Sequence, residues 1–207
     1  ICGLRKVEKG SILLDRKNIT NESVKKIRKA GLSHIPEDRN VRGLNRSMTI
    51  EENIVAAQIS DAPFSNGIML NNTKMLEYTN ELIDKFDIRP RNPQTLTQGM
   101  SGGNAQKIVV AREVSIGGKV LIASQPTRGV DIGAIESIRT ILMDVKEKGL
   151  GVLLVSADLE EIFSLSDRII VIHEGEITGN LQVDEADEEK VGLLMMGGKR
   201  RKEKCHE

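Results

Sequence analysis

Residues 96–107 of the chain have the sequence LTQGMSGGNAQK, in which Ser101, Gly102 and Gly103 stand immediately before a helical pattern of apolar residues. The first amides of a helix have no intrahelical acceptor, and the positive end of the helix dipole lies behind them. Glycine lets a backbone approach an anion closely, and the Ser101 hydroxyl adds a donor. The stretch therefore predicts a phosphate site. A plain glycine turn that caps an ordinary helix is the alternative.

A second stretch, VLIASQPTRGVD at residues 120–131, begins as an apolar run and ends in polar residues. Further apolar, β-branched runs occupy residues 151–156 and 168–173, and a helical pattern closed by a glycine separates the first two runs. Strands that alternate with helices predict right-handed crossovers and a parallel sheet. Because such sheets bind ligands at the carboxyl ends of their strands, we expect a site near Ser124, Ala157 and Glu37.

The part of the chain before these stretches is predicted to begin with two strands and a helix and to be largely helical from about residue 41 to 98. Three elements come first, namely a strand at residues 11–15, a helix capped by Thr20 or Asn21 that stops at Gly31, and a strand at residues 32–35. Thr49 and Glu52 form a capping box, which predicts the start of a helix. A 3.6-residue apolar period predicts another helix at residues 73–86. Residues from about 41 to 98 therefore form a candidate inserted subdomain.

The composition disfavours several classes of function. The 207 residues include 30 basic and 30 acidic ones, so no net charge draws the chain to nucleic acid. Aromatic residues are 2% of the chain, which leaves few platforms for stacking bases. Cys2 and Cys205 form no disulfide framework or zinc-site pattern. With no signal peptide and no apolar run of membrane-spanning length, we expect a cytosolic protein.

From about residue 3 to residue 198, the chain resembles the second ATP-binding cassette of tandem-cassette ABC importers for simple sugars and nucleosides. The motifs that carry the resemblance are HIPEDR at 34–39, MSGGNAQK at 100–107, QPTRGVD at 125–131 with Gly133-Ala134, and LSDR at 165–168. Residues 123–126 and 195–198 favour the nucleoside branch. The resemblance implies an α/β, P-loop NTPase-like parallel-sheet core at residues 1–40 and 99–198, an inserted α-helical subdomain at about 41–98, and a basic tail at 199–207.

The resemblance also assigns roles to loop residues. Glu37 stands in the place of the Q-loop glutamine, and Glu37, Asp38 and Arg39 belong to a coupling loop near which the membrane subunit docks. Asp131 matches the D-loop aspartate, which reaches across the interface between two cassettes. Taken alone, Glu37 is an ordinary surface carboxylate. Asp131 alone is an ordinary helix N-cap, and that role can coexist with the D-loop role.

The catalytic positions depart from the family pattern. Ala123 stands where an aspartate holds Mg²⁺, Ser124 where a glutamate polarises water, and Ala157 where the switch histidine contacts the γ-phosphate. No G-x-x-x-x-G-K-[ST] phosphate loop occurs in the sequence. Family members carry it just upstream of the segment matching Gly3, so we expect a chain truncated at its N-terminus, a misassigned start being the alternative. The chain's own nucleotide site is therefore predicted to be inactive, with no intact catalytic residue and no metal site.

Ser101, Gly102, Gly103 and Asn104 match the signature residues that contact the γ-phosphate of a nucleotide held by an opposite cassette. The resemblance implies a catalytically degenerate cassette that donates this loop to a competent one, expected in the same full-length polypeptide. ATP and Mg²⁺ belong to the full assembly and not to this chain alone. The other expected partners are transmembrane permease subunits, which place the chain in the cytoplasm, peripherally on the inner face of the cell membrane. No nucleic-acid partner is expected.

Two rival interpretations stay open. A soluble ABC ATPase of DNA repair or translation would share the signature loop, although a nucleic-acid partner usually leaves a basic patch. A non-ABC α/β module that binds a small molecule would share the fold class and leave the match of motifs to coincidence.

Overall fold

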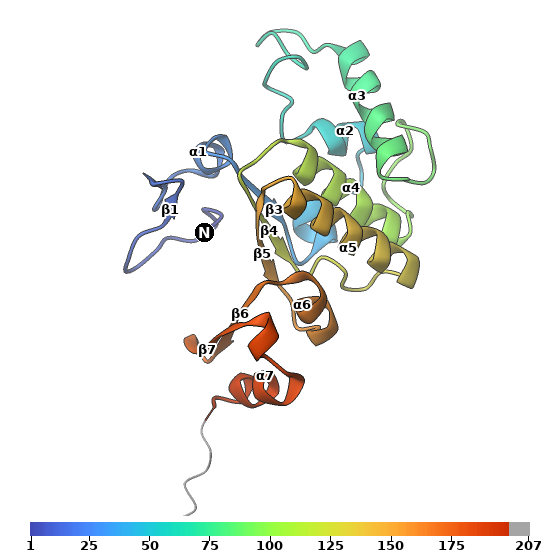
Figure 1. Cartoon of the computed structure of the whole chain (residues 1–207). Coiled ribbons are helices and arrows are strands. Elements are labelled where there is room, and N and C mark those ends of the chain that lie inside the picture. The colour runs from blue at the N-terminus through green and yellow to red at the C-terminus, as the bar shows by residue number, and fades with distance from the viewer. Residues whose placement is uncertain (199–207) are drawn as a thin grey trace, which may run out of the picture. The chain divides into compact units, whose positions relative to one another are not determined.

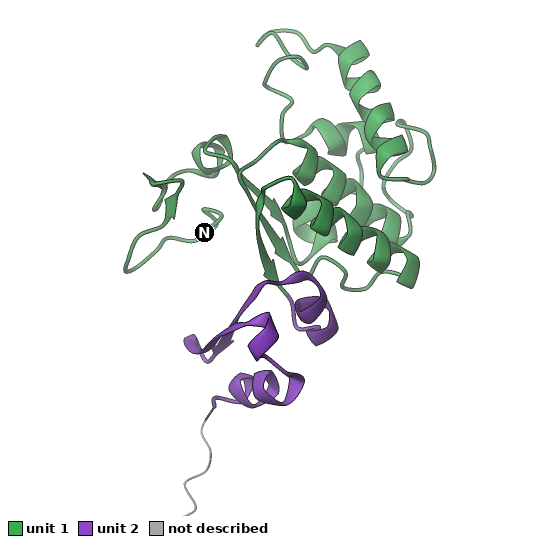
Figure 2. Cartoon of the chain, viewed as in Figure 1, with its two compact units in different colours: residues 1–155 green, residues 156–207 purple. Residues whose placement is uncertain are grey.

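The computed structural model describes residues 1–198 of the chain. The chain divides into two compact units, residues 1–155 and residues 156–207 (Figure 2). The predicted basic tail at residues 199–207 lies outside the described residues.

The first unit is organised around a three-stranded parallel sheet with the order β3-β4-β5 (Figure 1). Its strands are β3 (Leu32–Ile35), β4 (Val120–Ser124) and β5 (Gly151–Val155). The predicted bounds of the first two strands are confirmed. The third strand was predicted one residue too long at its C-terminal end. Leu121 and Ala123 of the central strand β4 are completely buried, which explains why this strand is a continuous apolar run.

Two long helices pack on this sheet. Helix α4 (Gly102–Ser115) contacts β3, and α5 (Ile132–Glu147) contacts β5 and α4 (Figure 1). Residues 108–111 of α4 have no exposed surface, so this helix is buried on nearly all sides. Helix α5 is amphipathic and buries Ile138, Leu142 and Val145 on one face, as its periodicity predicted.

The N-terminal elements differ from the prediction in two details. Instead of one strand at residues 11–15, a hairpin joins β1 (Leu13–Leu14) to β2 (Lys17–Asn18). The predicted cap of α1 (Val24–Lys29) was wrong, because the cap is Ser23. The side chains proposed as caps accept other bonds, Thr20 from the Ile12 amide at 2.7 Å and Asn21 from the Val7 amide at 2.7 Å.

The segment between β3 and α4 contains a one-turn π-helix, η1 (Arg39–Gly43), followed by α2 (Ile50–Val55) and α3 (Asn72–Lys85). The predicted capping box of α2 is confirmed: the Thr49 amide donates to Glu52 at 2.8 Å, and the Glu52 amide donates to Thr49 at 3.2 Å. The ends of this segment are tied together, since the Ile50 amide donates to Thr95 at 2.9 Å and the Thr97 amide to Met48 at 3.0 Å.

The second unit contains α6 (Leu159–Leu165), β6 (Arg168–His173), β7 (Glu176–Gln182), the short 3₁₀-helix η2 (Val183–Glu185) and α7 (Glu188–Met195). Strand β6 has the predicted bounds but forms an antiparallel pair with β7 rather than joining the parallel sheet. Glu174 and Gly175, both at positive φ, reverse the chain in a two-residue turn that makes the next strand antiparallel.

Candidate functional site

The start of α4 is set by Ser101, which caps the helix. The Ser101 oxygen accepts hydrogen bonds from the Asn104 amide at 3.3 Å and from the Asn104 side chain at 3.0 Å. Its own hydroxyl proton therefore remains available to donate. The Asn104 side-chain oxygen accepts from the Arg89 amide at 2.7 Å, so this side chain is held in the fold. The amides of Gly102 and Gly103 lie in the first turn, where no intrahelical acceptor exists.

The first two residues of α4 lie so close to their neighbours that no side chain fits there. A methyl group on Gly103 would come within 2.6 Å of the Asp131 carboxylate and 2.8 Å of the Ala134 side chain. A methyl group on Gly102 would come within 2.8 Å of the Gly129 carbonyl oxygen. The structure therefore brings together two stretches that the sequence places apart, the start of α4 and the loop after β4.

Asp131 ends that loop and caps α5. Its carboxylate accepts a hydrogen bond from the Ala134 amide at 3.0 Å, and the residue is exposed. The N-cap interpretation of Asp131 is thus confirmed, while its D-loop role remains a prediction. Both roles are compatible, since a capping carboxylate uses one oxygen and keeps further lone pairs.

The segment after β3 is tied to the same loop. Glu37 forms an ion pair with Arg128, and both side chains are more than half exposed. Asp38 caps η1, accepting from the amides of Asn40 at 2.9 Å and Val41 at 3.1 Å. Sequence analysis did not select Arg128 as a site residue. Its place in the TRGVD stretch was the only signal.

The carboxyl end of β4 carries no acidic side chain. Ala123 is completely buried and Ser124 is half-buried, and the degenerate role of these two positions remains a prediction. Residues 1–198 contain no cluster of three or more His, Cys, Asp or Glu side chains that could hold a metal ion. These residues do not fit the Mg²⁺ that the resemblance implies for a competent site. Ala157 is exposed and belongs to the second unit.

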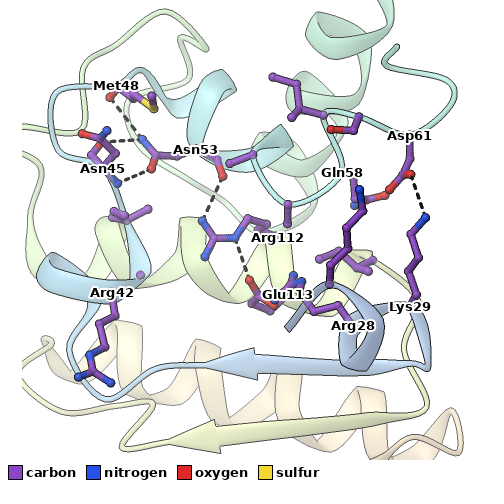
Figure 3. Close-up of a pocket in the computed structure, with 18 of the residues that line it drawn as sticks. Arg28, Lys29, Arg42, Asn45, Met48, Asn53, Gln58, Asp61, Arg112 and Glu113 are labelled. Carbon is purple, nitrogen blue, oxygen red and sulfur yellow. Dashed lines mark hydrogen bonds and ion pairs between the residues drawn. The ribbon is translucent and has the colours of Figure 1, made fainter. Parts of the chain in front are cut away.

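A cavity of about 690 Å³ opens beside α4 (Figure 3). Residues from α1, η1, α2 and α4 line it, and several of them are basic, namely Lys25, Arg28, Lys29, Arg42 and Arg112. The lining includes Val41, Arg42 and Gly43 of η1, the helix that Asp38 caps.

Glu113 connects the elements around this cavity. Its side chain is only 2% exposed and accepts hydrogen bonds from Arg28 at 2.9 Å, Arg112 at 2.9 Å and the His34 amide at 3.2 Å. Arg112 also donates to the Asn53 carbonyl at 3.2 Å, which joins α4 to α2 (Figure 3). Burial lowers the pKa of His34, an effect that the Glu113 carboxylate opposes and Arg28 reinforces.

Sequence analysis missed this network. The only available signal was an Arg-Glu pair at residues 112–113, within an otherwise apolar helix. Such a pair is buried only when partners from other elements satisfy it.

Comparison with known proteins agrees with this geometry. The sequence profile of the family described as ABC transporter matches residues 1–128. The nucleoside import ATP-binding protein NupA of Lactococcus lactis subsp. cremoris is 41% identical over 198 residues, covering 96% of this chain and 39% of NupA. The glucose import ATP-binding protein TsgD13 of Haloferax volcanii is 41% identical over 200 residues, covering 96% of this chain and 36% of TsgD13. The chain thus spans about two-fifths of the length of these relatives.

A solved dimer of the ATP-binding cassette MJ0796, bound to ADP and Pi, has a TM-score of 0.75 at 23% identity and covers 88% of this chain and 77% of that one. This likeness shows the fold, an α/β cassette of the P-loop NTPase type, as predicted. No helix in residues 1–198 is long and apolar enough to cross a membrane. The non-ABC interpretation was wrong, because the matching profile covers more than half of the sequence: the chain belongs to the ABC transporter family.

Proposed function

We propose that the chain is an ATP-binding-cassette domain of an importer for simple sugars or nucleosides, and that it lends its signature loop to a competent cassette. The observation that carries the proposal is the contrast between two ends of the site. The start of α4 has the exposed Ser101 hydroxyl followed by Gly102 and Gly103, two residues with no side chain of their own and with amides in the first turn of the helix. The end of β4 presents a buried alanine instead of an acid.

The residues of this chain would act on a bound nucleotide from one side only. Backbone amides at the start of α4 are fixed dipoles, and they suit the charged oxygens of a phosphate held by the opposite cassette. Asp131 lies against the same helix start and would contact the opposite cassette as a D-loop residue. ATP and Mg²⁺ would be held by the competent cassette, where Mg²⁺ supplies charge neutralisation of the transferred phosphoryl group.

The chain's own site would be inactive. Ala123, Ser124 and Ala157 supply neither a metal ligand nor a base nor a phosphate contact, and the 207 residues contain no phosphate-loop motif.

The relatives' names support an importer, and they make transmembrane permease subunits the expected partners. We place the permease contact at the cavity beside α4, because its lining includes residues 41–43 of η1, the helix that Asp38 caps, and because it carries basic side chains. The helical segment from about residue 41 to 98 would form the subdomain that faces the permease. This arrangement puts the chain in the cytoplasm, on the inner face of the cell membrane, next to a competent cassette of the same polypeptide.

The test is Ser101→Arg in the assembled importer, with ATP hydrolysis measured at saturating Mg-ATP. The bulky side chain occupies the space in front of the α4 amides, so hydrolysis at the competent site falls roughly 100-fold, the scale for losing a fixed donor to a transferred group. Ser23→Arg is the matched control, because Ser23 is also an exposed helix cap, on α1. If the Ser101 variant assembles normally and keeps full ATPase activity, the donated-loop proposal is wrong.

A further inference from the structure

The Arg39 side chain joins two loops that lie far apart in the sequence. Its Nη1 donates to the Arg128 carbonyl oxygen at 2.8 Å, and its Nη2 donates to the Gly129 carbonyl oxygen at 2.8 Å. Arg39 follows β3, whereas residues 128 and 129 follow β4. A planar guanidinium fork is preorganised to hold two successive carbonyls at once.

The loop that receives these bonds is not held by regular secondary structure. Gln125 has φ +48° and Gly129 has φ +65°, so the backbone turns through the left-handed region at both ends of the loop. A non-glycine residue in that region is unfavourable and persists only where neighbouring contacts fix it. Inside the loop, the Arg128 amide donates to the Gln125 carbonyl at 3.1 Å.

The same guanidinium also lies against the start of α4. A methyl group on Gly102 would stand 2.7 Å from Arg39 Nη2. The Gly129 carbonyl that accepts from Nη2 lies 2.8 Å from that methyl position. Gly102 thus contacts both the Arg39 guanidinium and the Gly129 carbonyl. The next residue, Gly103, contacts the Asp131 carboxylate.

The geometry points to Arg39 as a positioning residue. It holds the loop of residues 125–131 against the start of α4, so that the α4 amides and Asp131 form one ordered surface before a partner arrives. This role rests on the proposed function, because the ordered surface is the one offered to the competent cassette. Arg39 itself contacts no nucleotide. By ordering the loop in advance, Arg39 reduces the conformational entropy that the loop would otherwise lose when the two cassettes close on ATP.

The inference predicts a division between KM and kcat. With Arg39→Ala in the assembled importer, the loop has to be ordered at each binding event, so the KM for ATP rises roughly threefold to tenfold. Once the site is closed, the α4 amides stand in their usual place, and kcat stays within about twofold. Arg39→Lys does not fully restore the KM, since an ammonium group lacks the planar fork whose two nitrogens bond the two carbonyls separately.

A second measurement follows the loop without nucleotide. Amide hydrogen exchange of the nucleotide-free importer should be roughly tenfold or more faster at residues 129–134 in Arg39→Ala than in the wild type. The matched control is Arg46→Ala, which removes an exposed arginine that donates to Asn40 at 3.1 Å and does not touch the loop. Exchange and KM in this control match the wild type.

The outcomes separate the inference from the proposed function. Unchanged exchange in Arg39→Ala overturns the inference, and so does faster exchange with an unchanged KM. A fall in kcat at constant KM also overturns it, because Arg39 would then act in the chemical step. If Ser101→Arg leaves hydrolysis intact, the donated-loop proposal fails, whereas the exchange measurement still decides whether Arg39 orders the loop.

Discussion

Glu113 on α4 holds the guanidinium of Arg28 on α1 at 2.9 Å, at the floor of the cavity that we assign to the permease contact. The other oxygen of the same carboxylate accepts from Arg112, whose side chain is 10% exposed. One buried carboxylate therefore balances two cations and also accepts a hydrogen bond from the His34 amide of β3.

Glu113→Ala should lower the free energy of unfolding by about 3 kcal/mol, because it leaves the nearly buried Arg112 and the partly buried Arg28 without their counter-ion. Urea unfolding followed by circular dichroism measures this loss. Glu77→Ala is the matched control: Glu77 pairs with Lys74 at 2.7 Å, but both side chains are more than half exposed. Its loss should be about 0.5 kcal/mol or less. Equal losses in the two variants would contradict the role of Glu113 as a buried connection.

Gly103→Ala should destabilise the protein by about 1–3 kcal/mol, because the added methyl group overlaps the Asp131 carboxylate and the Ala134 side chain. Gly133→Ala serves as the control. A methyl group there meets only Asp131, at 3.6 Å, which is ordinary contact. We expect it to change the free energy of unfolding by less than about 0.5 kcal/mol, or to stabilise α5 slightly. Thermal unfolding of both variants tests the difference.

The stability of the protein should fall at mildly acidic pH through His34. Burial lowers the pKa of His34 in the folded state below its unfolded value of about 6.5, despite the opposing carboxylate of Glu113. Below about pH 6.5 the unfolded chain binds a proton at His34 more readily than the folded protein does. The free energy of unfolding is therefore highest above about pH 6.5 and decreases as the pH falls. His34→Gln should therefore show a shallower decline in unfolding free energy on acidification. Parallel pH curves for the two proteins would disprove this.

Restoring acids should not restore activity. In the double variant Ala123→Asp with Ser124→Glu, the position of residue 123 is completely buried, so a carboxylate there should cost about 3 kcal/mol or more in stability. We predict that neither acid restores activity in this chain alone, because nucleotide binding in this family depends on a phosphate loop and the 207 residues contain no match to that motif. We expect no saturable Mg-ATP binding by calorimetry and no turnover near ~1 s⁻¹. Micromolar binding would show that the chain builds a phosphate site from other residues.

Local sequence patterns predicted those elements well whose bounds depend on neighbouring residues in the chain. The apolar run at residues 120–124 defines β4, and the pair Thr49 and Glu52 defines the start of α2. The start of α1 was predicted wrongly because Thr20, Asn21 and Ser23 are all good caps. Only tertiary contacts, the amides of residues 7 and 12, decide which of them is available.

The candidate site was predicted residue by residue but not as an arrangement. Ser101, Gly102 and Gly103 were selected from their position before a helix, and the structure places them against Asp131, which was selected separately. The bonds of Arg39 to residues 128 and 129 span about ninety positions of sequence, and no periodic pattern encodes such a contact. The ion pair between Arg28 and Glu113 was missed for the same reason, since 85 positions separate the two residues.

The hydrogen bonds that tie residues 48 and 50 to residues 97 and 95 make the intervening chain a closed loop with a fixed base. The closure free energy of such a loop grows only logarithmically with its length, so doubling the length costs about 0.6 kcal/mol. Its most exposed stretch surrounds Ile68, which is 95% exposed. A fluorophore, an affinity tag or a foreign peptide inserted there would leave the parallel sheet undisturbed. Such an insertion would allow the cassette to be labelled and followed in a working assembly.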